Sequence, residues 1–352
     1  MDPDSVEGLR ASGGDGAADA IGPDGRVPHG SSDDPALLDF SANTNPHVPP
    51  AAEATYRAAF GTARSYPADD YPEFREAAAA FVGCEPAQVI PTAGGLEAIR
   101  LAMQTTVRTG DSVLLPYPSF GEYAREVRLQ GATPEFVPHD ELLDADPTGH
   151  ALAVVCNPNN PTGEAADSAT LRAFASRCRA AGTTLLVDEA FLGFTDEPSL
   201  AGTDGVVVAR SLTKLFGLPG IRMGYAVGTG RERDRLATAR RAWSMSAPAA
   251  AVGAHCYRQE KFVAETKARV ERERERERER LGDRFDVSPS DAPFLLFSVE
   301  GSGATVDEVL ASAREAGVAL RDARTFRGLD SHIRVAVRTP AENDRLLEAL
   351  DV

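Results

Sequence analysis

Four short apolar runs in the middle of the chain restrict its fold more than any other feature. The runs read DSVLLPYPSF, ALAVVCNPNN, TTLLVDEAF and GVVVARSLTK and begin at residues 111, 151, 183 and 205. Each is rich in aliphatic residues and short enough for a buried strand, and helix-like segments such as LRAFASRCRAAG separate some of them. Strands that alternate with helices predict an α/β domain, with a mostly parallel central sheet flanked by helices.

The pattern along the chain divides it into four regions. Residues 1–30, rich in Gly, Asp, Ala and Ser, are predicted to form a flexible acidic tail, and residues 31–65 an N-terminal arm. Residues 66–242 carry the alternating pattern and are expected to form the large, ligand-binding domain. Mixed helix and strand signals then predict a smaller α+β domain over residues 243–352.

A Glu-Arg repeat from Glu271 to Arg280 lies in this last region. As a helix it would place opposite charges at i,i+3 but like charges at i,i+4, so the net gain from ion pairs is small. We expect an exposed charged helix that links to the small domain.

The charge balance excludes two classes of partner. The chain has 37 Lys and Arg against 53 Asp and Glu, a net charge of −16, whereas nucleic acids and anionic membranes need clustered positive charge. No apolar run approaches the roughly 18 residues of a membrane span, and the N-terminus lacks a signal peptide's basic start. Four scattered cysteines with no His cluster nearby indicate free thiols in a reducing cytoplasm and no metal site. The sequence therefore predicts a cytoplasmic protein with no nucleic-acid or membrane partner, and its acidic excess is typical of solubility at high salt.

Lysine is rare in this chain. Only three of the 37 basic residues are lysines, at positions 214, 261 and 267. Lys214 stands inside SLTKLFGLPGIRMGY, a largely apolar loop interrupted by glycines. Because the chain uses Arg nearly everywhere else, an amine at this position indicates a chemical role.

Polar and aromatic side chains follow the four predicted strands, at the edge where ligands gather in open α/β sheets. The stretch TAGGLE, from Thr92 to Glu97, also opens a predicted helix whose free N–H groups can hold a phosphate. An amine, a buried acid, a flat aromatic ring and a phosphate cradle are what pyridoxal phosphate requires. The residues after the strands are Phe120, Asn157, Asn160, Asp188, Glu189, Ser211 and Lys214, of which Asn157 is expected to build its turn.

From about residue 29 to the C-terminus the chain resembles the fold-type I pyridoxal-phosphate aminotransferases of class I/II. The motifs NPNNPTG, DEAF and SLTKLFGLPGIRMGY occur in the family's order. The resemblance implies a homodimer with active sites at the subunit interface and pyridoxal 5'-phosphate as cofactor. It also implies that Lys214 forms the Schiff base and shuttles protons, that Asp188 pairs with the pyridine nitrogen, and that Asn160 pairs with the ring's phenolic oxygen.

The other roles that the resemblance implies concern the cofactor ring, its phosphate and the substrate. Phe120 would stack on the ring. Arg334, in HIRVAVR, would hold the substrate's α-carboxylate in a bidentate contact. Tyr66 would reach the cofactor phosphate from the partner subunit. The remaining phosphate-binding residues implied are Gly94, Gly95, Ser211 and Arg222.

Two enzyme classes related to this family differ in which substrate bond breaks, and both fit the sequence. The chain resembles the L-threonine-O-3-phosphate decarboxylases in two segments. The first is His29-Gly30 followed by LLDFSANTNP, and the second is Arg321-Asp322 with RGL and IRVAVRTPAEN. The motif DEAF also puts Phe191 where aminotransferases of this branch usually have Tyr. The resemblance implies decarboxylation of L-threonine O-3-phosphate to (R)-1-amino-2-propanol O-2-phosphate in cobalamin biosynthesis, with Arg321 and His29 near the substrate phosphate. An aminotransferase acting on histidinol phosphate or a related amino acid is the alternative.

Two further points bear on this interpretation. A cofactor-binding regulatory protein with a degenerate fold would be expected to have lost Lys214, Asp188 or Arg334, and all three are present. The loop TAGGLEAI lacks the acidic or hydroxyl residue that many relatives carry, so backbone N–H groups must do more of the phosphate binding there.

Overall fold

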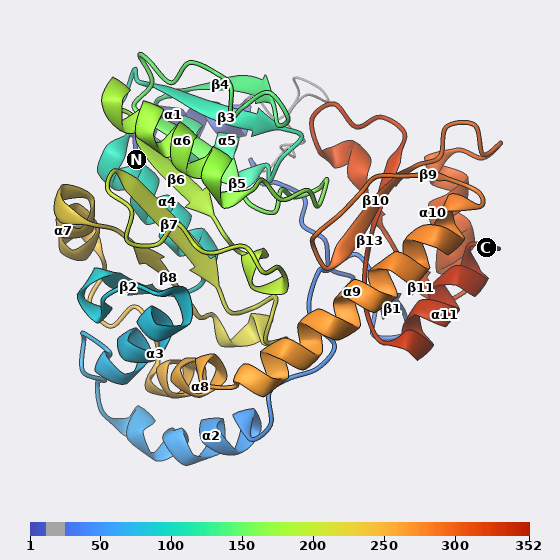
Figure 1. The fold of residues 1–352 in the computed structure, drawn as a ribbon, viewed down its shortest axis with the longest axis horizontal. Helices are drawn as coiled ribbons and strands as arrows, with labels where there is room; N and C mark the ends of the chain where they lie inside the picture. The colour runs from blue at the N-terminus through green and yellow to red at the C-terminus, as the bar shows by residue number, and fades with distance from the viewer. Residues whose placement is uncertain (12–24) are drawn as a thin grey trace.

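The centre of the molecule is a seven-stranded sheet with strand order β2-β8-β7-β6-β5-β3-β4. The computed structural model describes residues 1–11 and 25–352. The ladders of this sheet are parallel except those of β8, which runs antiparallel to β2 and β7. The four apolar runs form β3, β5, β6 and β7, which confirms the predicted fold class (Figure 1). The strands are β2 (Val89–Thr92), β3 (Ser112–Tyr117), β4 (Thr133–Pro138), β5 (Leu152–Cys156), β6 (Thr184–Asp188), β7 (Val206–Ser211) and β8 (Gly224–Val227).

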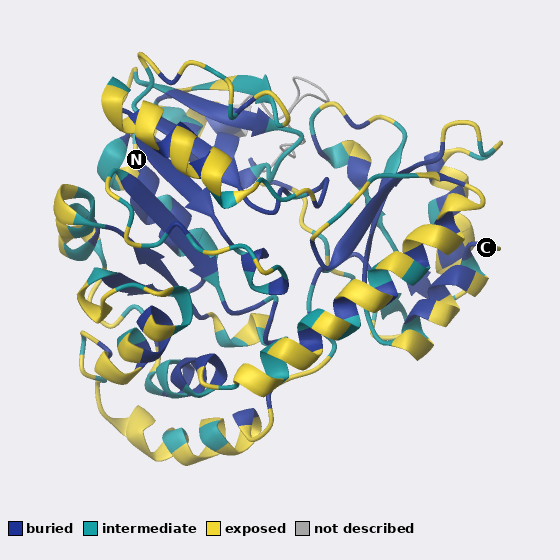
Figure 2. Cartoon of the chain, in the orientation of Figure 1, coloured by how far each residue is buried: buried dark blue, intermediate teal, exposed yellow. Residues whose placement is uncertain are grey.

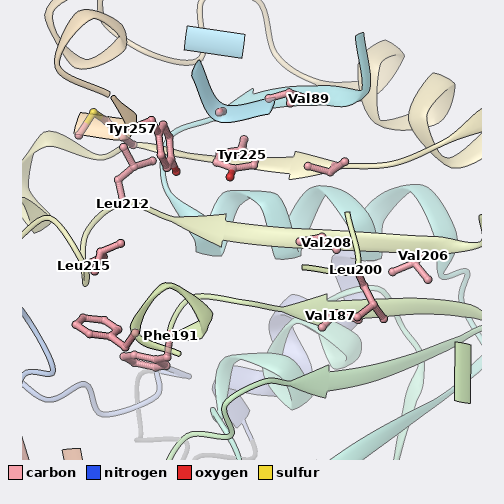
Figure 3. Close-up of a cluster of buried hydrophobic side chains, with 14 of the residues drawn as sticks. Val89, Val187, Phe191, Leu200, Val206, Val208, Leu212, Leu215, Tyr225 and Tyr257 are labelled. Atoms are coloured by element: carbon pink, nitrogen blue, oxygen red, sulfur yellow. The ribbon is translucent and has the colours of Figure 1, made fainter. Parts of the chain in front are cut away.

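Both faces of the sheet are covered, which explains why its strands read as continuous apolar runs. Val187 and Val208 pack into one hydrophobic layer, drawn in Figure 3, and Leu186 and Val207 pack into the other. Each fully buried Val or Leu side chain contributes roughly 1.5–3 kcal/mol to folding. Helices α3 (Pro72–Val82), α6 (Ser168–Ala181) and α8 (Ala247–Tyr257) cover the first layer, and α4 (Gly95–Thr106), α5 (Glu122–Leu129) and α7 (Gly230–Ala239) the second.

The small domain is built on a four-stranded antiparallel sheet with strand order β12-β13-β10-β9. A separate parallel pair joins β1 of the N-terminal arm to β11, so Phe40 is buried in the core of the small domain. Helix α9 runs from the large domain to this sheet (Figure 1). The elements are β1 (Leu38–Asp39), α9 (Glu260–Gly282), β9 (Asp286–Val287), β10 (Phe294–Ser298), α10 (Val306–Glu315), β11 (Val318–Ala319), β12 (Arg321–Asp322), β13 (His332–Ala336) and α11 (Pro340–Ala349).

The packing shifts one of the predicted domain boundaries. Helix α8 lies within residues 243–352, which were predicted to form the small domain, but it packs on α3 of the large domain. Helix α2 (Ala52–Ala59) of the predicted arm packs in turn on α8. The small domain therefore begins along α9, because α9 is the element that leaves the large domain.

Residues near the N-terminus form a helix, α1 (Pro3–Ala11). The N–H of Asp2 donates to the carbonyl of Leu129 at the end of α5 (2.9 Å), and Leu9 is buried. The prediction of a flexible tail over residues 1–30 is therefore wrong for this helix. The part of that prediction covering residues 12–24 lies outside the described residues.

Helix α9 contains the Glu-Arg repeat, and the repeat is not exposed on all sides. Figure 2 shows buried positions recurring along the helix, and they include Val270, Glu273, Glu277 and Leu281. Glu273 accepts hydrogen bonds from the guanidinium of Arg276 and the amide of Asn343 on α11. The repeat links the two domains as predicted, but the prediction of an exposed helix is wrong for this face. None of the described helices combines the length and the apolarity needed to cross a membrane.

Glu277 is 0 % exposed, and among the residues that the structure describes neither oxygen of its carboxyl group has a hydrogen-bond partner. Burial and the nearby charge of Glu273 raise its pKa well above the ordinary value, against the opposing charges of Arg276 and Arg269. Because the folded-state pKa lies above the unfolded one, the stability that this group contributes is present at acid pH. It is lost as the pH rises through the folded-state pKa.

Replacing this carboxyl group by an amide removes the titration and keeps the side-chain shape. We expect Glu277→Gln to raise the free energy of unfolding at pH 8 by about 1–3 kcal/mol relative to the parent protein, and by less at pH 5. Urea titrations at the two pH values measure this. The matched control is Glu279→Gln, at an exposed position of the same helix. Equal effects of the two substitutions at both pH values would contradict the prediction.

Candidate active site

A cavity of about 340 Å³ lies at the carboxyl ends of β5, β6 and β7 and is closed on its other side by the small domain. The strand ends contribute Cys156, Asp188 and Ser211 to its wall. The site residues predicted from the sequence that line this cavity are His29, Gly95, Phe120, Asn160, Asp188, Ser211, Lys214, Arg222, Arg321 and Arg334.

Lys214 lies in the loop after β7 and is half-buried at the cavity wall. Its Nζ is 6.0 Å from the centre of the Phe191 ring. Burial lowers the pKa of Lys214 to about 8; the positive charges of Arg334 and Arg222 act in the same direction, and Asp188 opposes them. The side chain therefore supplies a neutral amine near pH 8, which is what a nucleophile or a proton acceptor needs.

Asp188 ends β6 and is 6 % exposed. Its carboxylate accepts hydrogen bonds from the hydroxyl of Tyr123 (2.6 Å) and the N–H of Ala190 (3.0 Å). Burial, with the charge of Glu189, raises the pKa of Asp188 above its ordinary value, although these two hydrogen bonds and the charge of Lys214 oppose the rise. The carboxylate is thus held in place with part of its surface facing the cavity. The neighbouring acid Glu189 turns away and forms a buried ion pair with Arg210 (2.8 Å).

The loop before α4 forms a cradle shaped by glycine. Gly94 has φ +104°, and a Cβ there would meet the guanidinium of Arg222 at 2.8 Å. A Cβ on Gly95 would meet Cβ of Ser211 at 3.0 Å. Helix α4 begins at Gly95 without a side-chain cap, so its first N–H groups are free for an anion. The hydroxyls of Ser211 and Thr213, 2.8 Å apart, add further donors. This set of donors fits a phosphate group, and phosphate binding by these residues stays a prediction.

Aromatic side chains form another part of the wall. Phe120 packs edge-on against Tyr123, with ring centres 5.6 Å apart. Phe191 is buried and packs edge-on against Phe294 at 5.1 Å. Because Phe191 has no hydroxyl, it offers no hydrogen bond to a ligand in the cavity. Asn160 remains as a polar group nearby, and its side-chain Oδ1 accepts a hydrogen bond from Arg334.

Two arginines of the small domain lie side by side at the cavity. Arg321 on β12 is the register partner of Arg334 on β13. Arg334 is 5 % exposed and donates to Asn160 and to the carbonyl of Ser41 (3.0 Å). Arg321 donates to the carbonyl of Pro28 and to the hydroxyl of Thr325, each at 2.8 Å.

The two guanidinium groups lack negative partners. Among the described residues neither Arg321 nor Arg334 forms an ion pair with a carboxylate, and the Nε of each is buried without a hydrogen-bond partner. Burial and the charge of Arg321 lower the pKa of Arg334 to about 9. Arg334 is buried and Arg321 is half-buried, and two adjacent cations of this kind without an ion-pair partner are costly unless an anionic ligand pairs with them. The arrangement fits a ligand with two negative groups.

Two predicted residues do not line the cavity. Gly94 lies behind it, at the contact with Arg222. Tyr66 is 80 % exposed and packs at a tilt against Trp243, with ring centres 4.6 Å apart. The contact of Tyr66 with the cofactor of a partner subunit stays a prediction.

Three residues that the sequence did not single out also belong to the site. Tyr123 follows Phe120 by three positions, the spacing that puts two side chains on one helix face, and this signal could have found it. Thr213 stands one residue before Lys214 and lines the cavity. Asn43 is buried at the cavity wall, and its side-chain Oδ1 has no hydrogen-bond partner among the described residues. No pattern in SANTNP distinguishes this asparagine from Asn45. Asn157 fixes its turn by accepting from the N–H of Ala166 (2.8 Å), which confirms its expected role.

Comparisons with known proteins agree with this geometry. Residues 35–350 match the family described as aminotransferase class I and II. The chain is 32% identical to a histidinol-phosphate aminotransferase of Symbiobacterium thermophilum, over 89% of this chain and 90% of that protein. It is 29% identical to a threonine-phosphate decarboxylase of Salmonella typhimurium, over 89% and 90% of the two chains. A histidinol-phosphate aminotransferase of Sinorhizobium meliloti, solved in complex with pyridoxal-5'-phosphate, has the same fold, with a TM-score of 0.77, 22% identity, and coverage of 88% of this chain and 89% of that one. The phosphate cradle, the buried Asp188 and the amine of Lys214 fit that cofactor. The chain belongs to the class I and II aminotransferase family, a group of pyridoxal-phosphate enzymes.

Proposed function

We propose that this enzyme decarboxylates L-threonine O-3-phosphate to (R)-1-amino-2-propanol O-2-phosphate, a carboxy-lyase reaction of cobalamin biosynthesis. The observation that carries the proposal is Phe191, which lines the cavity without the hydroxyl that aminotransferases of this branch usually have there. The pair of guanidinium groups, Arg321 and Arg334, supports it as two adjacent anion sites. The substrate has a carboxylate and a phosphate on neighbouring carbons and therefore needs two anion sites close together. His29 lines the cavity as a further group that can contact the phosphate.

In this proposal each group of the site has a task. Bound pyridoxal 5'-phosphate supplies a sink for the electron pair that stays on Cα when the carboxylate leaves as carbon dioxide. Asp188 would hold the pyridine nitrogen, Phe120 would pack against the ring, and the amine of Lys214 would hold the cofactor aldehyde and supply the proton that replaces the carboxylate on Cα. Arg334 and Arg321 would bind the carboxylate and the phosphate and would thereby set the orientation of the substrate's Cα bonds, which decides the bond that breaks.

A histidinol-phosphate aminotransferase is the second candidate, because the relative at 32% identity has that function. Its substrate carries one anionic group, and its co-substrate, a dicarboxylate, would need both arginines. The arginine pair therefore agrees with either function, whereas Phe191 in place of a tyrosine favours the decarboxylase.

One pair of incubations separates the two candidates. Purified holoenzyme is given threonine phosphate in one reaction and histidinol phosphate with 2-oxoglutarate in the other. Carbon dioxide release in the first reaction is the expected result. Glutamate formation in the second reaction, with no carbon dioxide in the first, would establish the aminotransferase instead.

The lowered pKa of Lys214, about 8, predicts how capture of the cofactor depends on pH. Only the neutral amine attacks an aldehyde, so the capture rate of cofactor-free protein is expected to rise about tenfold per pH unit below pH 8 and to level off above it. Stopped-flow absorbance measures this rate, with Nα-acetyl-lysine, an ordinary amine, as the reference. A rate that keeps rising tenfold per unit from pH 8 to pH 10 would contradict the prediction.

We also propose a homodimer in which Tyr66 reaches the partner subunit's cofactor phosphate. Large apolar side chains are exposed around Tyr66, and a second copy of the chain would cover them. Sedimentation of the holoenzyme is expected to give the mass of a dimer, and a monomer would refute the proposal. The exposed residues are Tyr56, Phe60, Tyr66 and Trp243.

A small phosphorylated amino acid is the partner in this proposal, and the net charge of −16 supports the absence of a nucleic-acid or anionic-membrane partner and a cytoplasm of high salt content. The same charge predicts that the protein does not bind DNA in a retardation assay at low salt.

A further inference from the structure

The segment from residue 25 to residue 30, here called the strap, crosses one wall of the cavity. Val27, Pro28, His29 and Gly30 all line the cavity. The strap belongs to the region for which a flexible tail was predicted, but its contacts hold it against both domains.

On the large domain the strap docks on the start of α5. The guanidinium of Arg125 donates to the carbonyl of Gly25 (2.8 Å). Val27 is buried against Gly121, where a Cβ would come within 2.9 Å of the valine side chain. The imidazole Nε2 of His29 lies 3.2 Å from the carboxylate of Glu122. Three residues of the strap therefore contact α5 or the residue just before it.

On the small domain the strap meets β12. The guanidinium of Arg321 donates to the carbonyl of Pro28 (2.8 Å). A Cβ on Gly30 would approach the carbonyl oxygen of Ser41 to 2.3 Å and Cδ of Arg321 to 3.3 Å, so only glycine fits there. The strap thus brings His29 to the same side of the cavity as Arg321.

Glu122 is 5 % exposed and is not part of the cavity wall. Arg125 also contacts it, at 3.4 Å. Behind it, the buried carboxylate of Glu126 contacts Arg100 (3.2 Å) and Arg125 (3.3 Å). Burial raises the pKa of Glu122, but the hydrogen bond from His29 and the charge of Arg125 outweigh it and leave the pKa below the ordinary value. A buried, ionised carboxylate in this network is a fixed acceptor for the Nε2–H of His29.

We propose that Glu122 is a positioning residue for recognition of the substrate phosphate, acting through His29. By accepting the Nε2–H, it fixes the orientation of the imidazole, which lines the cavity beside Phe120. A protonated imidazole held in this way keeps its second N–H for an anion. The phosphate then meets His29 and Arg321 together. The inference deepens the proposed function and rests on it for the identity of the substrate.

The test uses binding as well as turnover, so that it can be read even if the proposed reaction is wrong. The probe for binding is 3-phosphoglycerate, which carries a carboxylate and a phosphate but no amine, titrated calorimetrically into holoenzyme. Glu122→Ala is expected to weaken its affinity about 5- to 30-fold, and to raise the KM for threonine phosphate by the same factor with kcat changed less than about twofold. Glu122→Asp is expected to restore part of the loss. Glu315→Gln, at an exposed position of α10, serves as the control.

A double-mutant cycle decides whether Glu122 acts through His29. If it does, the double variant Glu122→Ala with His29→Ala loses no more affinity than His29→Ala alone. Additive losses would overturn the inference, as would unchanged affinity in Glu122→Ala. Should Glu122→Ala fail to fold, Glu122→Gln replaces it in the same cycle. Failure of the proposed function shows as absence of carbon dioxide release, whereas failure of this inference shows as a lack of coupling in the binding of 3-phosphoglycerate.

Discussion

Substitution of Lys214 by alanine is expected to lower kcat by at least about 10⁴-fold and to abolish covalent attachment of the cofactor. Of the three lysines, this one lines the cavity and has a pKa lowered to about 8. Removing it takes away both the nucleophile and the proton donor of the proposed reaction. Borohydride reduction followed by peptide mass spectrometry measures attachment directly: the parent protein should carry the cofactor on the peptide of Lys214, and the variant should carry none.

The chain supplies its own control for this experiment. Lys261 lies on the exposed side of α9, 3.6 Å from Glu265, and Lys261→Ala should leave turnover and the reduced adduct unchanged. Lys267 pairs with Asp196 and is equally remote from the chemistry. A reduced adduct on Lys261 or Lys267 in the parent protein would show that the amine has been assigned to the wrong lysine.

Replacing Arg334 by lysine is expected to produce the second largest effect, a fall in kcat/KM for threonine phosphate of about 10²- to 10³-fold. The planar guanidinium reaches Asn160 and Ser41 at the same time as it faces the cavity. A compact ammonium group cannot keep these contacts and also form two parallel hydrogen bonds to an anion. Steady-state kinetics measure kcat/KM, and calorimetric titration with 3-phosphoglycerate measures the affinity for an anionic ligand. We expect both to fall.

Arg338 provides the matched control for this second substitution. It stands four residues further along the chain and contacts Glu342 (2.8 Å) and the carbonyl of Asp39 (3.2 Å) instead of the cavity. Arg338→Lys should change kcat/KM by less than about threefold. Equal losses in the two variants would mean that any arginine-to-lysine change in this domain disturbs the site, and the role given to Arg334 would be withdrawn.

The large domain could be predicted from the sequence because its strands are buried on both faces. Burial on two sides requires uninterrupted apolar runs, and β5, β6 and β7 are such runs. The site residues could be predicted for a related reason: they stand where those runs end, and parallel strands bring their ends to one edge. Asp188 and Lys214 were found in this way.

Other features could not be predicted because no local pattern records them. The alternating Glu-Arg repeat has no apolar stripe, so the burial of Glu277 depends entirely on how α9 packs. Helix α1 has a weakly apolar sequence, and its order comes from contact with α5. Thr213 and Asn43 reach the site because of the conformations of their loops. The same short sequences would be equally suitable for a solvent-exposed turn, so no pattern marks these two residues.

The division of the site between two bodies has a consequence for how the protein melts. Lys214 and Asp188 belong to the large domain, whereas Arg321 and Arg334 belong to the small domain, and α9 connects the two. A ligand that binds the amine and both guanidinium groups contacts both domains and therefore links them. Such a ligand should make the two domains unfold in a single cooperative transition, because neither can unfold without releasing it. A ligand that engages only one domain should stabilise that domain alone and separate the two transitions in a calorimetric scan.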